Sequence, residues 1–267
     1  MRTEALLREH VAFERWVSSR VGASSRVGEL QVTRNDDLPL VYDCNLAWVE
    51  LPDAPLGELE ASWDRAFSGS PVAHRYFVFE DAAAAHRRQG EFAAAGYVPG
   101  AACAMLQVGD AFAVTNHEVV VRPVPADHPD FTAVRRKVWE NAGYPAAVSA
   151  QVLREETLEA TRTGCVCYVG YLRGEPAGTI GLHTRGAHGY IDFVGTVPEH
   201  RNKGVGVTLL AAMGEASKVA RHRFLGLTVE HGNPARRLYE RLHYEVLGEI
   251  RTFLRSGPTT SRSNMPK

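Results

Sequence analysis

The sequence predicts an α/β (α+β) fold in which a mixed, mostly antiparallel central sheet is flanked by helices, in two similar domains. Strand-like runs alternate along the chain with helix-like segments whose apolar residues recur every three or four positions. Glycine-containing turns join neighbouring strands in the way that antiparallel hairpins require. A strand, helix, strand arrangement occurs twice, which is typical of an internal repeat.

The second half of the chain has the clearest succession of elements. Its strands are expected at residues 119–123, 165–172, 177–183, 190–197, 224–229 and 244–253, and its helices at residues 131–141, 147–160, 204–219 and 234–242. The segments 173–175 and 185–189 contain the glycines typical of hairpin links. An antiparallel meander therefore leads into the helix that begins at Gly204.

The repeat consists of a strand, a helix-like segment and a second strand, with a tyrosine-containing pair before the second strand. It runs through residues 74–108 in the first half and residues 222–254 in the second. Gly96-Tyr97 and His243-Tyr244 occupy the same point of the two copies. Gene duplication explains this pattern, although strand, helix, strand units are common enough to arise independently.

The chain has 267 residues, more than the roughly 100–200 residues of a typical domain. One strand-like run ends before residues 110–116, and a new alternating segment begins after them. We therefore expect an N-terminal domain at residues 1–115 and a second domain at residues 116–254. Residues 255–267 are rich in Ser, Thr and Pro, which predicts a flexible tail.

The overall composition is that of an ordinary globular protein, with 45% hydrophobic and 23% charged residues. The formal net charge of −1 gives no bulk attraction to nucleic acid or to a membrane, so neither partner is expected. No apolar run reaches the roughly 20 residues that cross a bilayer. Residues 1–16 read as an amphipathic helix rather than as a secretion signal. Together these features predict a cytoplasmic protein.

Cysteine and histidine give no sign of a metal site. The four cysteines are too scattered for a disulfide framework and form no C-x-x-C pair. We expect Cys165 and Cys167 to be packing residues that share neither a metal nor a disulfide. Histidines such as His183 and His188, beside a hairpin turn, are expected to be solvated because no third fixed ligand accompanies them.

The segment from Val197 to Gly206 carries the strongest functional signal. A strand runs into a basic, glycine-bearing turn and then into a helix with apolar residues three to four positions apart. The first N–H groups of a helix lack partners within the helix, and the helix dipole is positive there, so main-chain donors can hold an anion. Gly204 and Gly206 have no Cβ to obstruct a phosphate, and Arg201 and Lys203 add positive charge. We predict a phosphate or pyrophosphate ligand.

The turn fits neither common nucleotide loop. The pattern G-x-x-x-x-G-K-[ST] is absent, and Leu209 stands where G-x-G-x-x-G needs its third glycine. With Val197-Pro198 in front, Arg201-Asn202-Lys203-Gly204-Val205-Gly206 instead resembles the [R/Q]-x-x-G-x-[G/A] signature of the GNAT superfamily of acyl-coenzyme A dependent N-acyltransferases.

A second segment strengthens this resemblance. The residues from Asn233 to Tyr239 are similar to a family helix that opens with Asn and carries an aromatic residue further on, although His243-Tyr244 replaces the usual glycine-aromatic pair. The resemblance covers about residues 118–253. It implies a tandem arrangement in which the second half keeps the cofactor loop and the N-terminal half is a degenerate GNAT-like domain.

The resemblance also implies a site for acetyl-CoA. Backbone amides from Lys203 to Gly206 would hold the pyrophosphate, and the strand end at Thr196 and Val197 would hydrogen-bond the pantetheine arm. The candidate cofactor-binding residues are Thr196, Val197, Arg201, Asn202, Lys203, Gly204, Val205, Gly206 and Asn233.

The implied reaction is attack of a neutral amine on a thioester, with departure of a coenzyme A thiolate. Asp192 is the candidate base, and Glu230 is the second candidate. The direction of the Asp192 side chain depends on the strand register and on any bulge in the strand. Tyr239 is the candidate acid for the departing sulfur, with a phenol pKa near 10 beside a thiol pKa of roughly 8.5. The amide of Thr196 or Val197 is a candidate donor to the thioester carbonyl. For each side chain a purely structural role is the alternative.

We therefore expect an N-acyltransferase that moves an acetyl group from acetyl-CoA to an amine by direct transfer in a ternary complex, without a metal. The alternative is a non-catalytic acyl-CoA-binding sensor or scaffold module. The acceptor can be a small-molecule amine or a protein amine, and both a monomer and a homodimer remain open.

Overall fold

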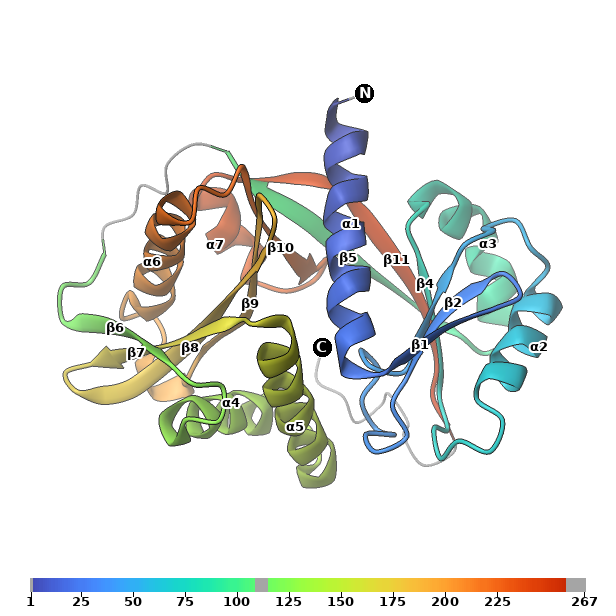
Figure 1. Ribbon diagram of the computed structural model, residues 1–267, viewed down its shortest axis with the longest axis horizontal. Coiled ribbons are helices and arrows are strands. Elements are labelled where there is room, and N and C mark those ends of the chain that lie inside the picture. Colours follow the sequence, from blue (N-terminus) through green and yellow to red (C-terminus); the bar gives the residue numbers. More distant parts are fainter. Residues whose placement is uncertain (1, 109–114, 258–267) are drawn as a thin grey trace. The chain divides into compact units, whose positions relative to one another are not determined.

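The computed structural model describes residues 2–108 and 115–257, in two compact units (Figure 1). Among the described residues, one unit comprises residues 2–104 and 247–257, and the other comprises residues 105–108 and 115–246. The division falls within two strands, β5 (Val98–Gln107) and β11 (Tyr244–Arg255).

The first unit is built around a sheet in which β11 pairs with a strand from the N-terminal half. Its helices are α1 (Arg2–Val21), α2 (Leu56–Ala66) and α3 (Ala82–Ala94), and its other strands are β1 (Ala23–Val27), β2 (Leu30–Arg34), β3 (Leu46–Val49) and β4 (Arg75–Phe79). Strands β1, β2 and β3 pair antiparallel in sequence, and β3 and β4 pair parallel. Strand β11 runs antiparallel to β4, from the pair Arg251 and Phe79 to the pair Arg255 and Arg75.

Aromatic packing explains why β11 belongs to this unit. The rings of Phe92, on α3, and Phe253, on β11, stack with centroids 4.0 Å apart. Phe77 and Phe79, on β4, pack edge-on against the same Phe92 ring, and all four side chains are at most 1% exposed. Aromatic side chains bury large apolar areas, so Phe253 completes the core of the first unit.

The second unit contains the remaining elements. Its strands are β6 (Val119–Val124), β7 (Val166–Leu172), β8 (Glu175–Arg185), β9 (His188–Thr196) and β10 (Phe224–Glu230), and its helices are α4 (Pro129–Asn141), α5 (Ala146–Thr163), the short 3-10 helix η1 (Pro198–His200), α6 (Val205–Val219) and α7 (Arg236–Arg241). The sheet order is β6, β7, β8, β9, β10, with antiparallel pairs from β6 to β9 and a parallel pair between β9 and β10.

Helices cover both faces of this sheet. On one face, Phe131 and Ala160 of α4 and α5 pack with Cys167, Val169 and Phe193. On the other face α6 lies close to the strands. A Cβ on Gly178 would come within 2.8 Å of Val205 Cγ1 and 3.0 Å of Leu209 Cδ1, so glycine is needed there for the close approach of α6.

The predicted fold class is confirmed, and each element expected in the second half is present with ends shifted by a few residues. The helix expected at residues 147–160 ends three residues later, at Thr163, and α7 begins at Arg236 because Asn233 and the two residues after it form a turn. The layout of the repeat is also present, as β4, α3, β5 and as β10, α7, β11. At the equivalent turns, Gly96 and His243 both have positive φ, +82° and +61°, so histidine here takes the left-handed conformation that glycine takes in the first copy.

The compact units divide the chain differently from the predicted domains at residues 1–115 and 116–254. Residues from Leu247 onward lie in the first unit because β11 pairs with β4 and contributes Phe253 to that core. Arg255, expected to begin the tail, ends β11 and forms an ion pair with Glu60 at 2.9 Å. Residues 109–114 of the expected boundary and 258–267 of the expected tail lie outside the described residues. Among the described helices, none combines the length and apolar character needed to cross a membrane.

Candidate acyl-coenzyme A site

The turn before α6 leaves backbone amides pointing at an open helix end. Asn202 and Gly204 both have positive φ, +61° and +76°, which folds the chain sharply before the helix. At the start of α6, the amide of Thr208 donates to the carbonyl of Gly204 at 3.0 Å. The amides of residues 205–207 therefore precede the first helical hydrogen bond, which is the arrangement that accepts an anion.

The two glycines of the turn differ in their surroundings. Gly204 has the left-handed conformation, and a Cβ on it would come within 3.1 Å of Asn116 Cβ. Gly206 lies in the first turn of α6, and a Cβ there would meet nothing closer than Thr196 Oγ1 at 3.7 Å. The surface over Gly206 therefore has room for a ligand that a larger side chain would occupy.

Asn116 and Thr208, which the sequence analysis did not identify, hold the turn in place. The side-chain amide of Asn116 donates to the carbonyl of Lys203 at 2.9 Å, and its backbone amide donates to Thr208 Oγ1 at 3.0 Å. The Thr208 hydroxyl donates in turn to the carbonyl of Gly204 at 3.0 Å. The carbonyls of Lys203 and Gly204 are thus bonded within the protein, while the amides of residues 205–207 lie at the helix end.

The two predicted cations of the turn differ in their surroundings. Arg201 donates through Nε to the carbonyl of Thr196 at 3.3 Å, and its Nη atoms lie 2.9 and 3.2 Å from the side-chain oxygen of Asn141 in the amide orientation that satisfies both groups. The backbone amide of Arg201 donates to the carbonyl of Pro198 at 3.3 Å. Both the side chain and the amide of Arg201 thus shape the turn. Arg201 and Lys203 are both exposed, so both place positive charge beside the amides.

Strands β9 and β10 separate before they reach this turn. Their parallel register contains three pairs and ends at Tyr190 and Gly226, although both strands continue beyond that point. The amide of Val197 donates to the carbonyl of Ala177 on the β8 side, at 3.0 Å. Successive residues of a strand direct their N–H groups to opposite sides, so the amide of Thr196 faces the side of β10. Of the two predicted main-chain donors, only that of Thr196 faces the gap.

A β-bulge in β9 directs Asp192. Gly181 pairs with Asp192 and Thr179 pairs with Gly195, so β9 carries one extra residue between these pairs. Phe193 takes a positive φ of +54° inside the bulge, where its amide donates to Asp192 Oδ1 at 2.7 Å and its carbonyl accepts from Thr179 Oγ1 at 2.9 Å. As a result Asp192 and Phe193, although consecutive, both face α4 and α5.

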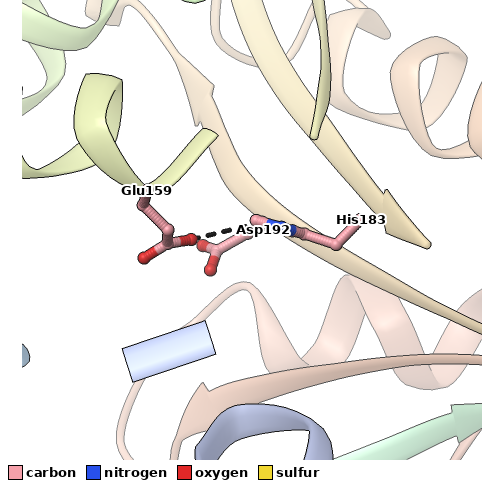
Figure 2. Close-up of side chains that lie close together, drawn as sticks. All are labelled: Glu159, His183 and Asp192. Atoms are coloured by element: carbon pink, nitrogen blue, oxygen red, sulfur yellow. Dashed lines mark ion pairs between the residues drawn. The ribbon is translucent and has the colours of Figure 1, made fainter. Parts of the chain in front are cut away.

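Asp192 lies against two further titratable side chains, Glu159 of α5 and His183 of β8 (Figure 2). One ligand-type atom from each residue lies within 4.8 Å of the other two, and His183 Nε2 is 3.2 Å from Glu159 Oε1. Burial raises the pKa of Asp192, while the nearby His183 and Arg135 oppose that rise. Burial also lowers the pKa of His183, which is 0% exposed, so the expectation of a solvated His183 is wrong.

This trio is the one group with metal-ligating geometry in the part of the chain that the structure describes. The two cysteines pack beside it. Cys167 is buried in the cluster of Phe131 and Phe193, Cys165 packs against that cluster, and both are free thiols. Burial raises the pKa of the Cys165 thiol, so it stays protonated and is a packing group.

Tyr239 is buried on α7, with its ring centroid 5.9 Å from that of Tyr244. Burial, and then the negative charge of Asp192, raise the pKa of Tyr239 to about 12. The phenol is therefore protonated at neutral pH but is a much weaker acid than a thiol of pKa roughly 8.5. It is suited to donate a hydrogen bond to a developing thiolate rather than to surrender its proton outright.

Glu230 and Asn233 lie apart from the buried trio. Glu230 is exposed at the end of β10, and its carbonyl accepts from the amide of Asn233 at 3.0 Å. The Asn233 side chain accepts from the amide of Ala235 at 2.9 Å, which stabilises the turn before α7. The structure thus places Asp192, not Glu230, beside Glu159 and His183.

Known proteins share this architecture. Residues 131–244 match the model of the acetyltransferase (GNAT) family. A GCN5-related N-acetyltransferase from Kribbella flavida has a TM-score of 0.67 at 16% identity, covering 97% of this chain and 98% of its own. A functionally unknown conserved protein from Staphylococcus epidermidis has a TM-score of 0.68 at 16% identity, covering 88% and 94%. A tandem GNAT protein from the clavulanic acid biosynthesis pathway has a TM-score of 0.56 at 16% identity, covering 92% and 89%.

Identities this low establish the fold alone, and no curated protein matches the chain in sequence. The family match contains the open turn before α6 and most of the second unit. The match to the GNAT family model covers residues 131–244, and the fold seen across the whole chain is similar to that of GNAT proteins.

Proposed function

We propose that the second unit transfers an acetyl group from acetyl-CoA directly to the amine of an acceptor, with both substrates bound at once. The observation that carries this proposal is the position of the open amides of residues 205–207 at the end of β9, where β9 has already separated from β10. A pyrophosphate at these amides would direct a pantetheine arm into the gap between the two strands.

The turn supplies the charge and the space that the diphosphate needs. Main-chain amides from Lys203 to Gly206 would donate to its oxygens, and Lys203 would add positive charge from the surface. Arg201 and Asn202 would act by shaping the turn, and Asn233 by stabilising the turn before α7. The amide of Thr196, which faces the gap, is suited to donate to the pantetheine arm or to the thioester carbonyl.

The chemistry follows from the groups beside the gap. A free amine attacks the thioester carbonyl, the new C–N bond forms, and Asp192 takes the proton that the nitrogen must lose. The C–S bond then breaks, and Tyr239 donates a hydrogen bond to the departing thiolate. Most of the rate enhancement would come from positioning the two substrates, with acid–base assistance of about 10²–10⁴-fold.

The acceptor is proposed by class only, as a small-molecule or protein amine. A net charge of −1 gives no reason to expect a nucleic acid or a membrane as partner. We propose a cytoplasmic protein that acts as a monomer or a homodimer.

The test combines two measurements on the full chain. Calorimetry measures binding of acetyl-CoA, and release of free coenzyme A thiol is followed over a panel of small amines, polyamines and lysine-containing peptides. Binding together with amine-dependent thiol release is the expected result. Binding without release across the panel would favour an acyl-CoA-binding sensor or scaffold, and absence of binding would contradict both functions.

A further inference from the structure

Two hydrogen bonds fix the orientation of the Asn116 side chain. Its Oδ1 accepts from the backbone amide of Glu118 at 2.9 Å, and its Nδ2 donates to the carbonyl of Lys203 at 2.9 Å. A backbone N–H can only donate, so the side-chain oxygen faces Glu118 and the side-chain NH₂ faces Lys203. The side chain therefore has one orientation, in which it holds the Lys203 carbonyl.

Thr208 anchors Asn116 to α6. The backbone amide of Asn116 donates to Thr208 Oγ1 at 3.0 Å, and the Thr208 hydroxyl donates to the carbonyl of Gly204 at 3.0 Å. A hydroxyl has one proton, so the Thr208 side chain accepts from Asn116 while it donates to Gly204. Two successive carbonyls of the turn, those of Lys203 and Gly204, are thus held by side chains of the protein.

The held carbonyls determine where the next amides point. Each peptide unit is planar and trans, so its C=O and the N–H of the following residue point in opposite directions. The bond from Asn116 to the Lys203 carbonyl therefore directs the Gly204 amide away from Asn116. Gly204 has a φ of +76°, and glycine takes positive and negative φ about equally readily, so the peptide unit before it could rotate if its carbonyl were not held. A rotated unit would turn a carbonyl oxygen, instead of an amide, toward an anion.

We propose that Asn116 is a positioning residue of the cofactor site, an inference that rests on the proposed function. By holding the Lys203 carbonyl, Asn116 keeps the Gly204 amide directed at the diphosphate of acetyl-CoA. Asn116 precedes β6 and lies outside residues 131–244, the segment that matches the family model. The affinity of the turn for a diphosphate thus depends on a residue that is N-terminal to the matched segment.

Asn35 of the first unit makes the same pair of side-chain bonds and supplies a matched control. Its Oδ1 accepts from the backbone amide of Asp37 at 3.1 Å, and its Nδ2 donates to the carbonyl of Val21 at 2.6 Å. Asn35→Ala and Asn116→Ala therefore remove the same two kinds of bond, but only Asn116→Ala removes a bond to the anion-binding turn. A purely structural role for Asn116 predicts a lower Tm and an unchanged acetyl-CoA affinity in both variants.

Calorimetry on the full chain measures the effect on cofactor affinity. Asn116→Ala is expected to weaken acetyl-CoA binding by about tenfold or more, because a hydrogen bond to a charged group is misdirected, and Asn35→Ala should leave binding unchanged. Thr208→Val, which removes the hydroxyl and keeps the branched side chain, is expected to weaken binding as well. Wild-type affinity in Asn116→Ala, or in Thr208→Val if Asn116→Ala does not fold, would overturn the inference.

Nuclear magnetic resonance observes the peptide unit itself. Lys203-Gly204 is the one Lys-Gly pair in the sequence, so labelling lysine carbonyls with ¹³C and glycine with ¹⁵N isolates the signal of the Gly204 amide. Saturating acetyl-CoA is expected to move this amide proton downfield in the wild type, as its bond to phosphate forms, and to move it much less in Asn116→Ala. An equal shift in the two proteins, or no shift in wild-type protein that binds the cofactor, would overturn the inference.

The proposed function can fail separately from this inference. If the wild type binds acetyl-CoA with the expected shift of Gly204 but acetylates no amine, the transfer reaction is contradicted and the role of Asn116 stands. If the wild type binds no acetyl-CoA, both are contradicted.

Discussion

The two units each contain a helix that follows a strand and a turn, and the two helix ends differ in what satisfies their amides. At α2 the amide of Leu56 donates to the carboxylate of Glu91 at 3.3 Å, and Arg88 holds that carboxylate in place at 2.8 Å. At α6 the end is formed by Gly204, with no side-chain cap. A carboxylate of the protein thus occupies the first helix end, whereas the second has no side-chain cap and is the end at which we propose that the diphosphate binds.

The turn before α2 carries negative side chains, and the turn before α6 carries positive ones. Glu50 and Asp53 precede α2, whereas Arg201 and Lys203 precede α6. A phosphate would meet negative charge at the first turn and positive charge at the second. In both units the fold places a helix N-terminus after a strand and a turn. A few residues of that turn decide whether the helix N-terminus can bind an anionic ligand. This difference agrees with the prediction of a degenerate N-terminal half.

The largest expected effect comes from filling the open helix end. Gly206→Glu places a carboxylate where the proposed diphosphate would lie, and is expected to abolish detectable acetyl-CoA binding in calorimetry. Gly90→Glu is the matched control, because a side chain on Gly90 of α3 would meet nothing within 4 Å. Equal affinity in the two variants would place the phosphates elsewhere.

The next effect concerns the base. Asp192→Asn is expected to lower turnover by about 10²–10⁴-fold and to leave acetyl-CoA affinity unchanged. Wild-type turnover in this variant would remove Asp192 from the mechanism.

Asp192→Asn, which is expected to lower turnover, is expected to raise the stability of the folded protein at neutral pH. Because burial raises the pKa of Asp192, its ionisation is less favourable in the folded protein than in the unfolded chain. The free energy of unfolding therefore falls as pH rises from the unfolded pKa through the folded one. Asp192→Asn removes this cost, so its Tm at pH 7 is expected to exceed that of the wild type, with the difference lost at acidic pH.

A smaller effect is expected at Tyr239. Tyr239→Phe keeps the buried ring and removes the hydroxyl, so turnover should fall by about tenfold while acetyl-CoA affinity is retained. Full activity in this variant would make Tyr239 a core residue only.

The smallest effect is expected at the N-terminus of α2 in the first unit. Glu91→Ala removes the carboxylate at the α2 end and is expected to cost about 0.5–1 kcal/mol in thermal unfolding, with acetyl-CoA stoichiometry unchanged at one per chain. A second equivalent bound by this variant would show that Glu91 alone closes the first unit to the cofactor.

Local sequence signals predicted the elements and the anion-binding turn, because helix periodicity, hairpin glycines and Gly204-Val205-Gly206 act within short stretches of chain. The pairing of β11 with β4 could not be read from the sequence, since it depends on the packing of Phe253 with Phe92. Asn116 could not be identified from the sequence for the same reason, because its hydrogen bond to the carbonyl of Lys203 joins residues far apart in the chain.

The buried trio was only partly predictable. Asp192 was a candidate from its place on the strand before the turn, but its direction depends on the bulge at Phe193, where a non-glycine residue takes a positive φ. His183 and Glu159 join it only through the register of β8 and the position of α5. A pair of histidine and carboxylate on separate elements carries no local spacing signal.

The most direct test of the whole account is a crystal structure of the full chain grown with excess acetyl-CoA. We expect the diphosphate to accept hydrogen bonds from the amides around Gly204 and Gly206, with the acetyl thioester between β9 and β10 beside Asp192. A diphosphate bound at another surface, or an empty turn under saturating cofactor, would contradict the account.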